Sequence, residues 1–413
     1  MKNKPLLIGP FIQIVTMDGL NEKGHIDNSS LQIEKNAGIL IEKGIIQEID
    51  NYNMLKNKAR QIGYQIKELK KEMVLLPGFI DCHTHLCYAG SREKDYALRV
   101  EGKTYLEIAT SGGGILDTVR HTREASLQEL AESLQIRSNR QLNYGITTCE
   151  VKSGYGLTVK DELKMLQAIN LVNNNNLIDL IPTCLAAHIC PPEYSIPEEY
   201  IKYVNKELLP EVIKQNLSKR VDIYIDKGAF GKYEAAIYIE KAKSLGFDVC
   251  IHADQFSVAG SKIASEFNAL SADHLEESNE ENLIDLSEKN VIGVVLPGAS
   301  IGLGLPFAKA KKMLDHNMCV AISSDWNPGS APMGDLLIQA SVLSAYEKLS
   351  IAETLAGITI RAAKALKLNN RGKLAKGMLA DMIAFDCTDY HYIFYLQGSL
   401  KPSIVWKNGK IIH

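Results

Sequence analysis

Five side chains that can bind a metal ion or transfer a proton stand at the ends of short apolar, β-like segments. They are His83, His85, His252, His274 and Asp325. If these segments are parallel strands of one barrel, their carboxyl ends meet at a single face. Residues that are far apart in the sequence then share one small space. This feature constrains both the fold and the chemistry of the chain.

The β-like segments alternate with segments of helical periodicity, which is the pattern of a parallel barrel. In 158–172, for example, Val159, Leu163 and Leu166 fall on one helical face. We therefore predict an α/β fold, with a TIM-like (β/α)8 barrel over 77–376. Its eight predicted strands are 74–80, 145–151, 178–184, 221–225, 247–252, 269–273, 291–296 and 319–324.

The two ends of the chain differ from its middle. Residues 1–76 contain short β-like runs such as FIQIVT and GILIEKGIIQEI. Residues 377–413 have the same character, and Asn408 and Gly409 form a typical hairpin turn. We predict that both ends fold together into one small β-sandwich domain beside the barrel.

The spacing of the histidines indicates a metal site. His83 and His85 are two residues apart, so on an extended strand end both imidazoles point the same way. Two nitrogens at this spacing can bind Zn²⁺ or Fe²⁺, and His252 and Asp325 would complete the set. We predict that His274 hydrogen-bonds the nucleophilic water or a substrate oxygen; a fourth nitrogen ligand, a base and a core histidine are the alternatives.

Composition argues against several other classes of protein. The net charge of −3 and the scattered Lys and Arg residues leave no basic surface for nucleic acid. No apolar stretch approaches the roughly 18 residues of a membrane span, and the first residues read as a strand rather than a signal peptide. The eight cysteines form no C-x-x-C pair, as is typical of reduced thiols. We expect a cytoplasmic protein that binds neither nucleic acid nor membrane.

Longer motifs carry a family resemblance. The segment PGFIDCHTHL (77–86), followed by His and Asp at strand ends, resembles the amidohydrolase superfamily of metal-dependent hydrolases in its one-metal form. Further blocks resemble the imidazolonepropionases within it, and EVKSGYGL (150–157) and SDWNPGS (324–330) are the most specific. The resemblance covers nearly the whole chain. It implies hydrolysis of 4-imidazolone-5-propanoate to N-formimidoyl-L-glutamate in histidine degradation, by a homodimer with one Zn²⁺ or Fe²⁺/Fe³⁺ per subunit.

Such a substrate is a cyclic amide with a carboxylate tail, and the resemblance implies residues for each part. Arg92 would bind the tail, because a guanidinium holds a carboxylate with two parallel hydrogen bonds. Arg120 and Arg123 are rival partners. Tyr155, in a turn flanked by glycines, would hydrogen-bond the substrate. His188 would also contact it, and its chemistry suits the developing oxyanion.

The loop after the last strand supplies further implied contacts. Asn327 and Ser330 would reach ring or carboxylate oxygens, and Gly329 would offer a backbone contact. Gln255 stands where related deaminases have a proton-shuttling Glu in H-x-x-E, and an amide cannot ionise. Some imidazolonepropionases have Glu there. We therefore hypothesise that Asp325 takes the proton of the attacking water and delivers it to the leaving ring nitrogen.

Other functions remain to be weighed against this one. A one-metal purine or pyrimidine deaminase would use the same fold, but Gln255 and Arg92 argue against it. A catalytically inactive scaffold has no reason to keep the full set of metal ligands. A two-metal hydrolase of the dihydroorotase kind needs a bridging lysine. Lys227 lies beyond its strand, and Lys152 is better suited to a supporting role.

Overall fold

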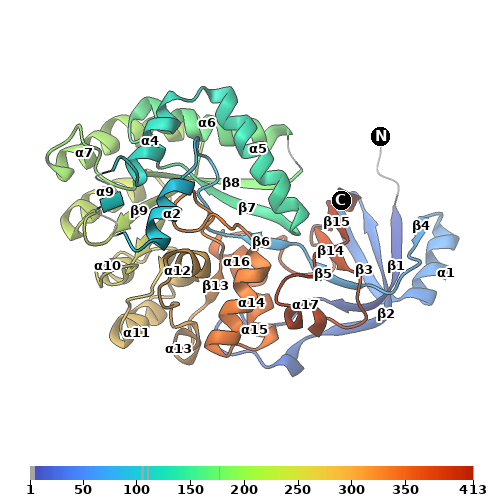
Figure 1. The fold of residues 1–413 in the computed structure, drawn as a ribbon. Coiled ribbons are helices and arrows are strands. Elements are labelled where there is room, and N and C mark those ends of the chain that lie inside the picture. Colours follow the sequence, from blue (N-terminus) through green and yellow to red (C-terminus); the bar gives the residue numbers. More distant parts are fainter. Residues whose placement is uncertain (1–4, 104–106, 109–110, 176, 413) are drawn as a thin grey trace.

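The chain folds into two β-sheets with helices around them (Figure 1). The computed structural model describes residues 5–103, 107–108, 111–175 and 177–412. One sheet is an eight-stranded parallel barrel with the order β13-β12-β11-β10-β9-β8-β7-β6, which confirms the predicted architecture. Its strands are β6 Phe79–Asp81, β7 Ile146–Lys152, β8 Asp179–Ala187, β9 Arg220–Ile225, β10 Asp248–Ala253, β11 Ser271–His274, β12 Ile292–Val295 and β13 Val320–Ile322.

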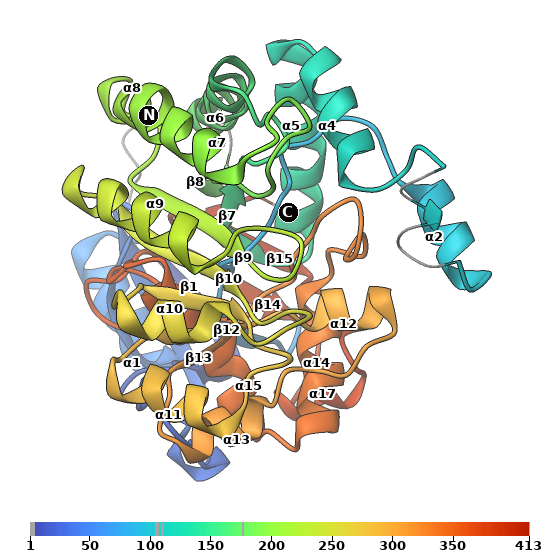
Figure 2. The ribbon, with the colours of Figure 1, turned by 90° about the vertical axis from the view of Figure 1, so that its left-hand side faces the viewer.

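Helices connect the strands and cover the outside of the barrel (Figure 2). The segment predicted to be helical at 158–172 is helix α6, Val159–Asn175. The other helices of the barrel part are α2 Glu93–Val100, α4 Ile115–Glu124, α5 Leu127–Asn143, α7 Pro197–Tyr203, η2 Val204–Leu208, α8 Leu209–Lys214, α9 Lys232–Ser244, α10 Gly260–Glu266, α11 Glu280–Glu288, α12 Pro297–Leu303, α13 Ala310–Asp315, α14 Leu336–Glu347, α15 Ile351–Gly357 and α16 Ile360–Ala365.

The ends of the chain form the second sheet, which is mixed and also eight-stranded. The path β16-β15-β14-β5-β1-β2-β3 joins strands from both ends, and β4 pairs with β1, so the ends do fold together as predicted. These strands belong to a single sheet with its own apolar core, in which the rings of Phe11 and Trp406 make an edge contact. The limits of the two domains stay a prediction. The bounds are β1 Leu6–Val15, η1 Asn28–Ser30, β2 Ile33–Glu42, β3 Ile45–Asn51, α1 Tyr52–Ile62, β4 Gln65–Glu68, β5 Val74–Pro77, β14 Met382–Phe385, α17 His391–Tyr395, β15 Ile404–Lys407 and β16 Lys410–Ile411.

The first predicted barrel strand is wrong in one respect. Residues 74–80 are two strands in different sheets: β5 pairs with β1 and β14 of the mixed sheet, whereas β6 pairs with β7 of the barrel. The change of sheet occurs at Gly78, whose N–H donates to Asp381 O at 2.9 Å. A side chain at this position would collide with Thr147, since an added Cβ would lie 2.4 Å from Thr147 Oγ1. The apolar sequence of 74–80 does not indicate where the chain leaves one sheet and joins the other.

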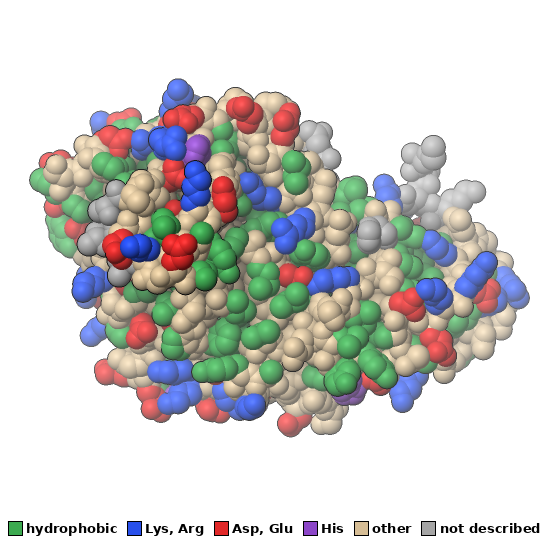
Figure 3. Space-filling view, in the orientation of Figure 1, with side chains coloured by type: hydrophobic (Ala, Val, Ile, Leu, Met, Phe, Trp, Pro, Cys, Tyr) green, Lys and Arg blue, Asp and Glu red, His purple; other side chains and the backbone are tan. Residues whose placement is uncertain are grey.

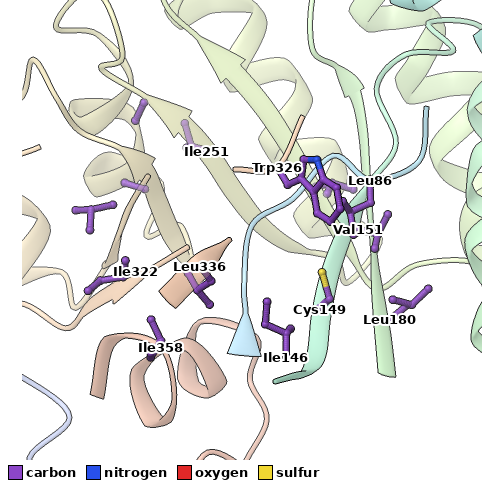
Figure 4. Close-up of a cluster of buried hydrophobic side chains, with 14 of the residues drawn as sticks. Leu86, Ile146, Cys149, Val151, Leu180, Ile251, Ile322, Trp326, Leu336 and Ile358 are labelled. Carbon is purple, nitrogen blue, oxygen red and sulfur yellow. The ribbon is translucent and has the colours of Figure 1, made fainter. Parts of the chain in front are cut away.

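Side-chain alternation along β7 separates the barrel interior from the layer beneath the helices. Cys149 and Val151 belong to the buried apolar cluster, together with Leu180 and Ile251 (Figure 4). Because successive side chains of a strand point to opposite faces, the residues between them point the other way. Lys152 accordingly reaches acidic groups of neighbouring strands rather than the apolar layer. The barrel interior is therefore polar near the site.

A buried carboxylate joins the two barrel strands that the sheet pairing leaves apart. Asp81, on β6, accepts hydrogen bonds from the backbone N–H of Ser324 at 2.9 Å and from its hydroxyl at 2.5 Å. Beyond β13, the N–H of Asp325 donates to His83 O at 3.1 Å. These bonds fix the ends of β6 and β13 relative to each other. Two of the predicted metal ligands are thereby placed side by side.

The surface carries charges of both signs. On the face shown in Figure 3, Lys and Arg side chains alternate with Asp and Glu over both parts of the molecule. Within the described residues, no helix is both long and apolar enough to cross a membrane.

Gly78→Ala should destabilise the protein, because the new Cβ would overlap Thr147, which is fully buried. We expect a loss of about 1–3 kcal/mol in the free energy of unfolding, as for other overpacked sites. Urea denaturation followed by circular dichroism measures it. Adding Thr147→Ala removes the two closest atoms and should restore most of the loss. If Gly78→Ala alone were as stable as the parent, this account of the change of sheet at Gly78 would be contradicted.

Candidate metal centre and active site

A cavity of about 160 Å³ opens at the carboxyl ends of the barrel strands. It brings together nearly all residues that the sequence singled out; His83 alone lies deeper and is fully buried. The predicted residues along its wall are His85, Arg92, Tyr155, His188, His252, Gln255, His274, Asp325, Asn327, Gly329 and Ser330.

The predicted metal ligands converge at the base of this cavity. Asp325 Oδ1 lies 3.5 Å from His83 Nε2 and 3.4 Å from His85 Nε2, and His85 Nε2 lies 3.3 Å from His252 Nε2. Two ligands at about 2.1 Å from a tetrahedral zinc ion are about 3.4 Å apart. His83 Nε2 and Asp325 Oδ1 are buried and have no hydrogen-bond partner among the described residues. Ligand atoms of His83, His85 and Asp325 lie within 4.8 Å of one another, and His252 adjoins this group through His85, so these nitrogen and carboxylate donors suit a divalent metal ion.

Two buried carboxylates orient the imidazoles. His83 Nδ1 lies 2.6 Å from Asp273 Oδ2, and His252 Nδ1 lies 3.0 Å from Asp222 Oδ2. When the carboxylate accepts a hydrogen bond from Nδ1–H, the proton of the neutral ring stays on Nδ1. The lone pair of Nε2 is then available to a metal ion. The sequence analysis missed Asp222 and Asp273. Both could have been predicted from an acidic residue inside a buried strand, in VDIYI for Asp222 and in SADH for Asp273.

Lys152 offsets part of the charge of these carboxylates. Its Nζ lies 2.7 Å from Asp222, 2.9 Å from Glu150 and 3.8 Å from Asp273, all of them buried. Burial opposes the charge of the ammonium group, but Asp222 and Glu150 hold the pKa of Lys152 above its usual value. Burial likewise opposes ionisation of Asp222, but His252 and Lys152 keep its pKa low. Lys152 thus holds, through ion pairs, the carboxylates that orient the histidines.

Two site residues have a strained backbone. His274 has φ +85° and Asp325 has φ +53°, values that non-glycine residues rarely adopt. Such conformations cost about 1–3 kcal/mol and persist where the surroundings hold them. His274 lies at the end of β11, and its Nδ1 is 3.5 Å from Glu276 Oε2. Ligand atoms of His83, His252 and His274 lie within 4.8 Å of one another. His274 is therefore close enough to the metal donors to bind either the ion or its water.

Asn327 is engaged by its own loop. Its Nδ2 donates to Asp325 Oδ2 and to Ser330 Oγ, each at 2.9 Å. Its Oδ1 accepts from the backbone N–H groups of Gly329 and Ser330, both at 2.8 Å. These bonds position Asp325 and shape the loop. That Asn327 contacts the substrate stays a prediction.

His188 faces the cavity in a defined tautomer. Its Nδ1 lies 3.0 Å from the carbonyl oxygen of Gly154, which can only accept, so Nδ1 carries the proton. Burial, His85 and His252 hold the pKa of His188 well below its usual value, so the ring is neutral. Nε2 is then an acceptor. That His188 contacts the substrate stays a prediction, and in this tautomer Nε2 would accept a hydrogen bond from it.

Tyr155 and Gln255 flank the cavity on two sides. Tyr155 is buried, and its ring lies 6.1 Å from that of His85 between centroids. Burial raises the pKa of its phenol, which therefore stays protonated and can donate. The hydroxyl of Tyr224 donates to Gln255 Oε1 at 3.1 Å. This bond leaves the NH₂ group of Gln255 as a donor toward the cavity.

Arg92 is the predicted cation that lines the cavity. Its Nε donates to Asp95 Oδ2 at 2.8 Å, which leaves both terminal nitrogens for other partners. The rival Arg120 is 55% exposed and pairs with Asp117 on its own helix, and Arg123 binds a backbone carbonyl and Glu193. Neither rival lines the cavity. Arg99 does, and the sequence analysis missed it because nothing in the local pattern distinguishes it from a surface residue.

Comparison with known proteins identifies the family. The sequence pattern of the amidohydrolase family matches residues 74–412. The chain belongs to the amidohydrolase family. It is therefore a hydrolase that acts on C–N bonds, and its histidine-rich cluster is a potential metal site.

Full-length relatives of this amidohydrolase are imidazolonepropionases. That of Clostridium tetani is 33% identical and covers 100% of this chain and 99% of its own length. That of Bdellovibrio bacteriovorus is 37% identical, with 98% and 96% covered. Among solved structures, a triazine hydrolase variant has a TM-score of 0.74 at 15% identity, covering 98% of this chain and 94% of its own. An adenosine deaminase from Xanthomonas campestris with bound zinc has a TM-score of 0.72 at 16%, with 98% and 92% covered. At this identity the structures share the fold.

Asp222→Asn should weaken metal binding by this amidohydrolase about 10- to 100-fold, because an amide holds the Nδ1 proton of His252 less strongly. Competition between the protein and a chromophoric chelator for added zinc measures the affinity. Asp248→Asn is the matched control, since Asp248 begins β10, the strand that carries His252, and pairs with Lys367 at the surface. Equal zinc affinity in Asp222→Asn and the parent would exclude this role.

Proposed function

We propose that this amidohydrolase is an imidazolonepropionase, which opens the ring of 4-imidazolone-5-propanoate to give N-formimidoyl-L-glutamate in histidine degradation. One observation carries the proposal: relatives with this name match the chain over its whole length at 33–37% identity. The cavity supports it, since metal donors and a guanidinium line the same small space. A cyclic amide with an anionic tail requires both.

We infer one Zn²⁺ or Fe²⁺/Fe³⁺ ion per subunit, held by His83, His85, His252 and Asp325. Three nitrogens and one oxygen suit either metal. When bound, the ion would make a water molecule acidic enough to ionise near pH 7. We further propose that the protein is a cytoplasmic homodimer, as the resemblance implies.

The reaction adds water to the ring carbonyl carbon and breaks its bond to the ring nitrogen. Asp325 accepts the proton of the attacking water and returns it to the departing nitrogen, so the ring opens to a carboxylate and a formimidoyl group. Burial opposes ionisation of Asp325, but His85 and the other histidines keep its pKa below its usual value. The carboxylate is therefore ionised and ready to accept a proton. His274 positions the water, and Asn327 holds Asp325 in place.

The remaining residues orient the substrate. Arg92 binds the propanoate tail, and Tyr155 donates a hydrogen bond to the substrate. His188 accepts a hydrogen bond from a ring N–H through Nε2, as its tautomer requires. Gln255 donates through its amide and cannot carry a proton. Gly329 and Ser330 close the cavity beside the tail.

A deaminase remains the second candidate, because an adenosine deaminase shares the fold. Gln255 argues against it, since deamination of a ring needs a group there that gives and takes protons. The two reactions differ in their products: a deaminase releases ammonia, whereas ring opening does not.

The purified protein should consume 4-imidazolone-5-propanoate, seen as loss of its ultraviolet absorbance, without release of ammonia. Removing the metal with a chelator should abolish turnover, and adding Zn²⁺ or Fe²⁺ should restore it, because the water is then activated again. Ammonia is measured in parallel with glutamate dehydrogenase. No turnover by folded, metal-loaded protein would refute the proposal, and ammonia release would favour the deaminase.

Asp325→Asn should lower kcat about 10²- to 10⁴-fold, because an amide cannot take the proton of the water. Metal content is measured on the same sample, so that loss of the ion is separated from loss of proton transfer. The control is Asp315→Asn, since Asp315 is exposed and pairs with His25 far from the cavity wall. Normal turnover in metal-loaded Asp325→Asn would rule out the proton-transfer role.

A further inference from the structure

Two guanidinium groups meet at one point of the cavity wall. Arg99, on α2, directs Nη1 and Nη2 at the carbonyl oxygen of Gly329, at 3.5 and 3.4 Å. Arg92, directly before α2, lies against the same glycine: an added Cβ on Gly329 would be 2.3 Å from Arg92 Nη1. Both arginines line the cavity. Gly329 is thus the residue whose lack of a side chain lets the two cations approach one loop.

The charges at this point do not balance. Asp95 is buried and accepts from Arg92 Nε and from Gly114 N, each at 2.8 Å. Within the described part of the chain, no carboxylate oxygen lies within ion-pair distance of Arg99. Arg99 contacts the Gly329 carbonyl and the ring of Tyr96, which lies 5.6 Å from the guanidinium carbon to the centroid. Two cations therefore share one anion, and an anionic ligand would restore neutrality.

The unused donors point to a planar anion. A guanidinium has five N–H groups in a rigid fork, and each arginine uses only part of its set for the contacts above. Burial and the charge of Arg92 hold the pKa of Arg99 below its usual value, which agrees with a cation that lacks its counter-ion. A carboxylate can accept hydrogen bonds from two such forks, since its two oxygens offer about four lone pairs.

We propose that Arg99 is a second specificity-determining residue, which binds the substrate's tail carboxylate together with Arg92 across Gly329. The inference rests on the proposed function and names the part of the substrate that Arg99 recognises. The loop from Asp325 to Ser330 spans both ends of the site: Asp325 belongs to the metal donors, and Gly329 lies between the arginines. The cavity thereby selects a substrate whose anionic tail is a short chain away from the reacting carbonyl.

The test compares two stable ligands of the metal-loaded protein: imidazole-4-propanoate, which has the tail, and 4-propylimidazole, which lacks its carboxylate. Arg99→Gln should raise the Kd of imidazole-4-propanoate about 10- to 100-fold, as expected for loss of a charge-assisted hydrogen bond. It should leave the Kd of 4-propylimidazole within about twofold. Isothermal titration calorimetry measures both. Arg92→Gln should weaken the binding of imidazole-4-propanoate in the same selective way. Arg99→Lys keeps the positive charge but lacks the forked guanidinium, so its Kd for this ligand should lie between those of the parent and Arg99→Gln.

Arg120→Gln is the matched control, because Arg120 lies outside this cavity and pairs with Asp117 and Glu124. It should bind both ligands as the parent does. Equal weakening of the two ligands by Arg99→Gln would mean that Arg99 only supports the Gly329 loop, and unchanged binding would mean that it has no part; either overturns the inference. Turnover of 4-imidazolone-5-propanoate by the parent protein decides the proposed function separately.

Discussion

The ammonium group of Lys152 is the interaction on which the rest of the site depends. It lies fully buried inside the barrel among Glu150, Asp222 and Asp273. Burial and the charge of Asp222 raise the pKa of Asp273 to about 7 even beside Lys152, and without Lys152 all three carboxylates would take up protons more readily. A protonated acid would no longer fix the Nδ1 proton of the imidazole beside it. The orientation of the histidines at the end of the barrel therefore depends on the buried charges inside it. The capacity to bind a metal ion depends on that orientation.

The strands and the loops divide the work of the site. The predicted metal donors stand at strand ends, where hydrogen bonds between neighbouring strands hold even the strained backbone of His274 and Asp325. The residues proposed to contact the substrate, such as Arg92 and Gly329, stand on loops and next to the helix that follows β6. This division is general in barrels of this kind, because rigid strands can hold the reacting groups while loops vary to suit the substrate. Arg99 fits the second group.

The sequence predicted that side chains at strand ends would gather in one small space, and the cavity confirms this. It did not predict features that depend on a neighbour from another strand. Residues 74–80 read as one strand because the apolar pattern does not record which sheet each half joins. The sequence could not show that the Gly154 carbonyl sets the tautomer of His188. Nor could it show that the Asn327 amide hydrogen-bonds with Asp325 and with its own loop.

By itself the sequence determined the barrel, the pairing of the two chain ends and the side chains that gather at the carboxyl ends of the strands. The periodicity of apolar residues and the types of residue that end each strand are local properties, so they can be identified in the sequence. The tertiary structure alone decided which carboxylates orient the imidazoles, which arginines share the cavity and which way each polar group donates. Those properties arise from contacts between residues as far apart as His83 and Asp273, and no local pattern encodes such distances.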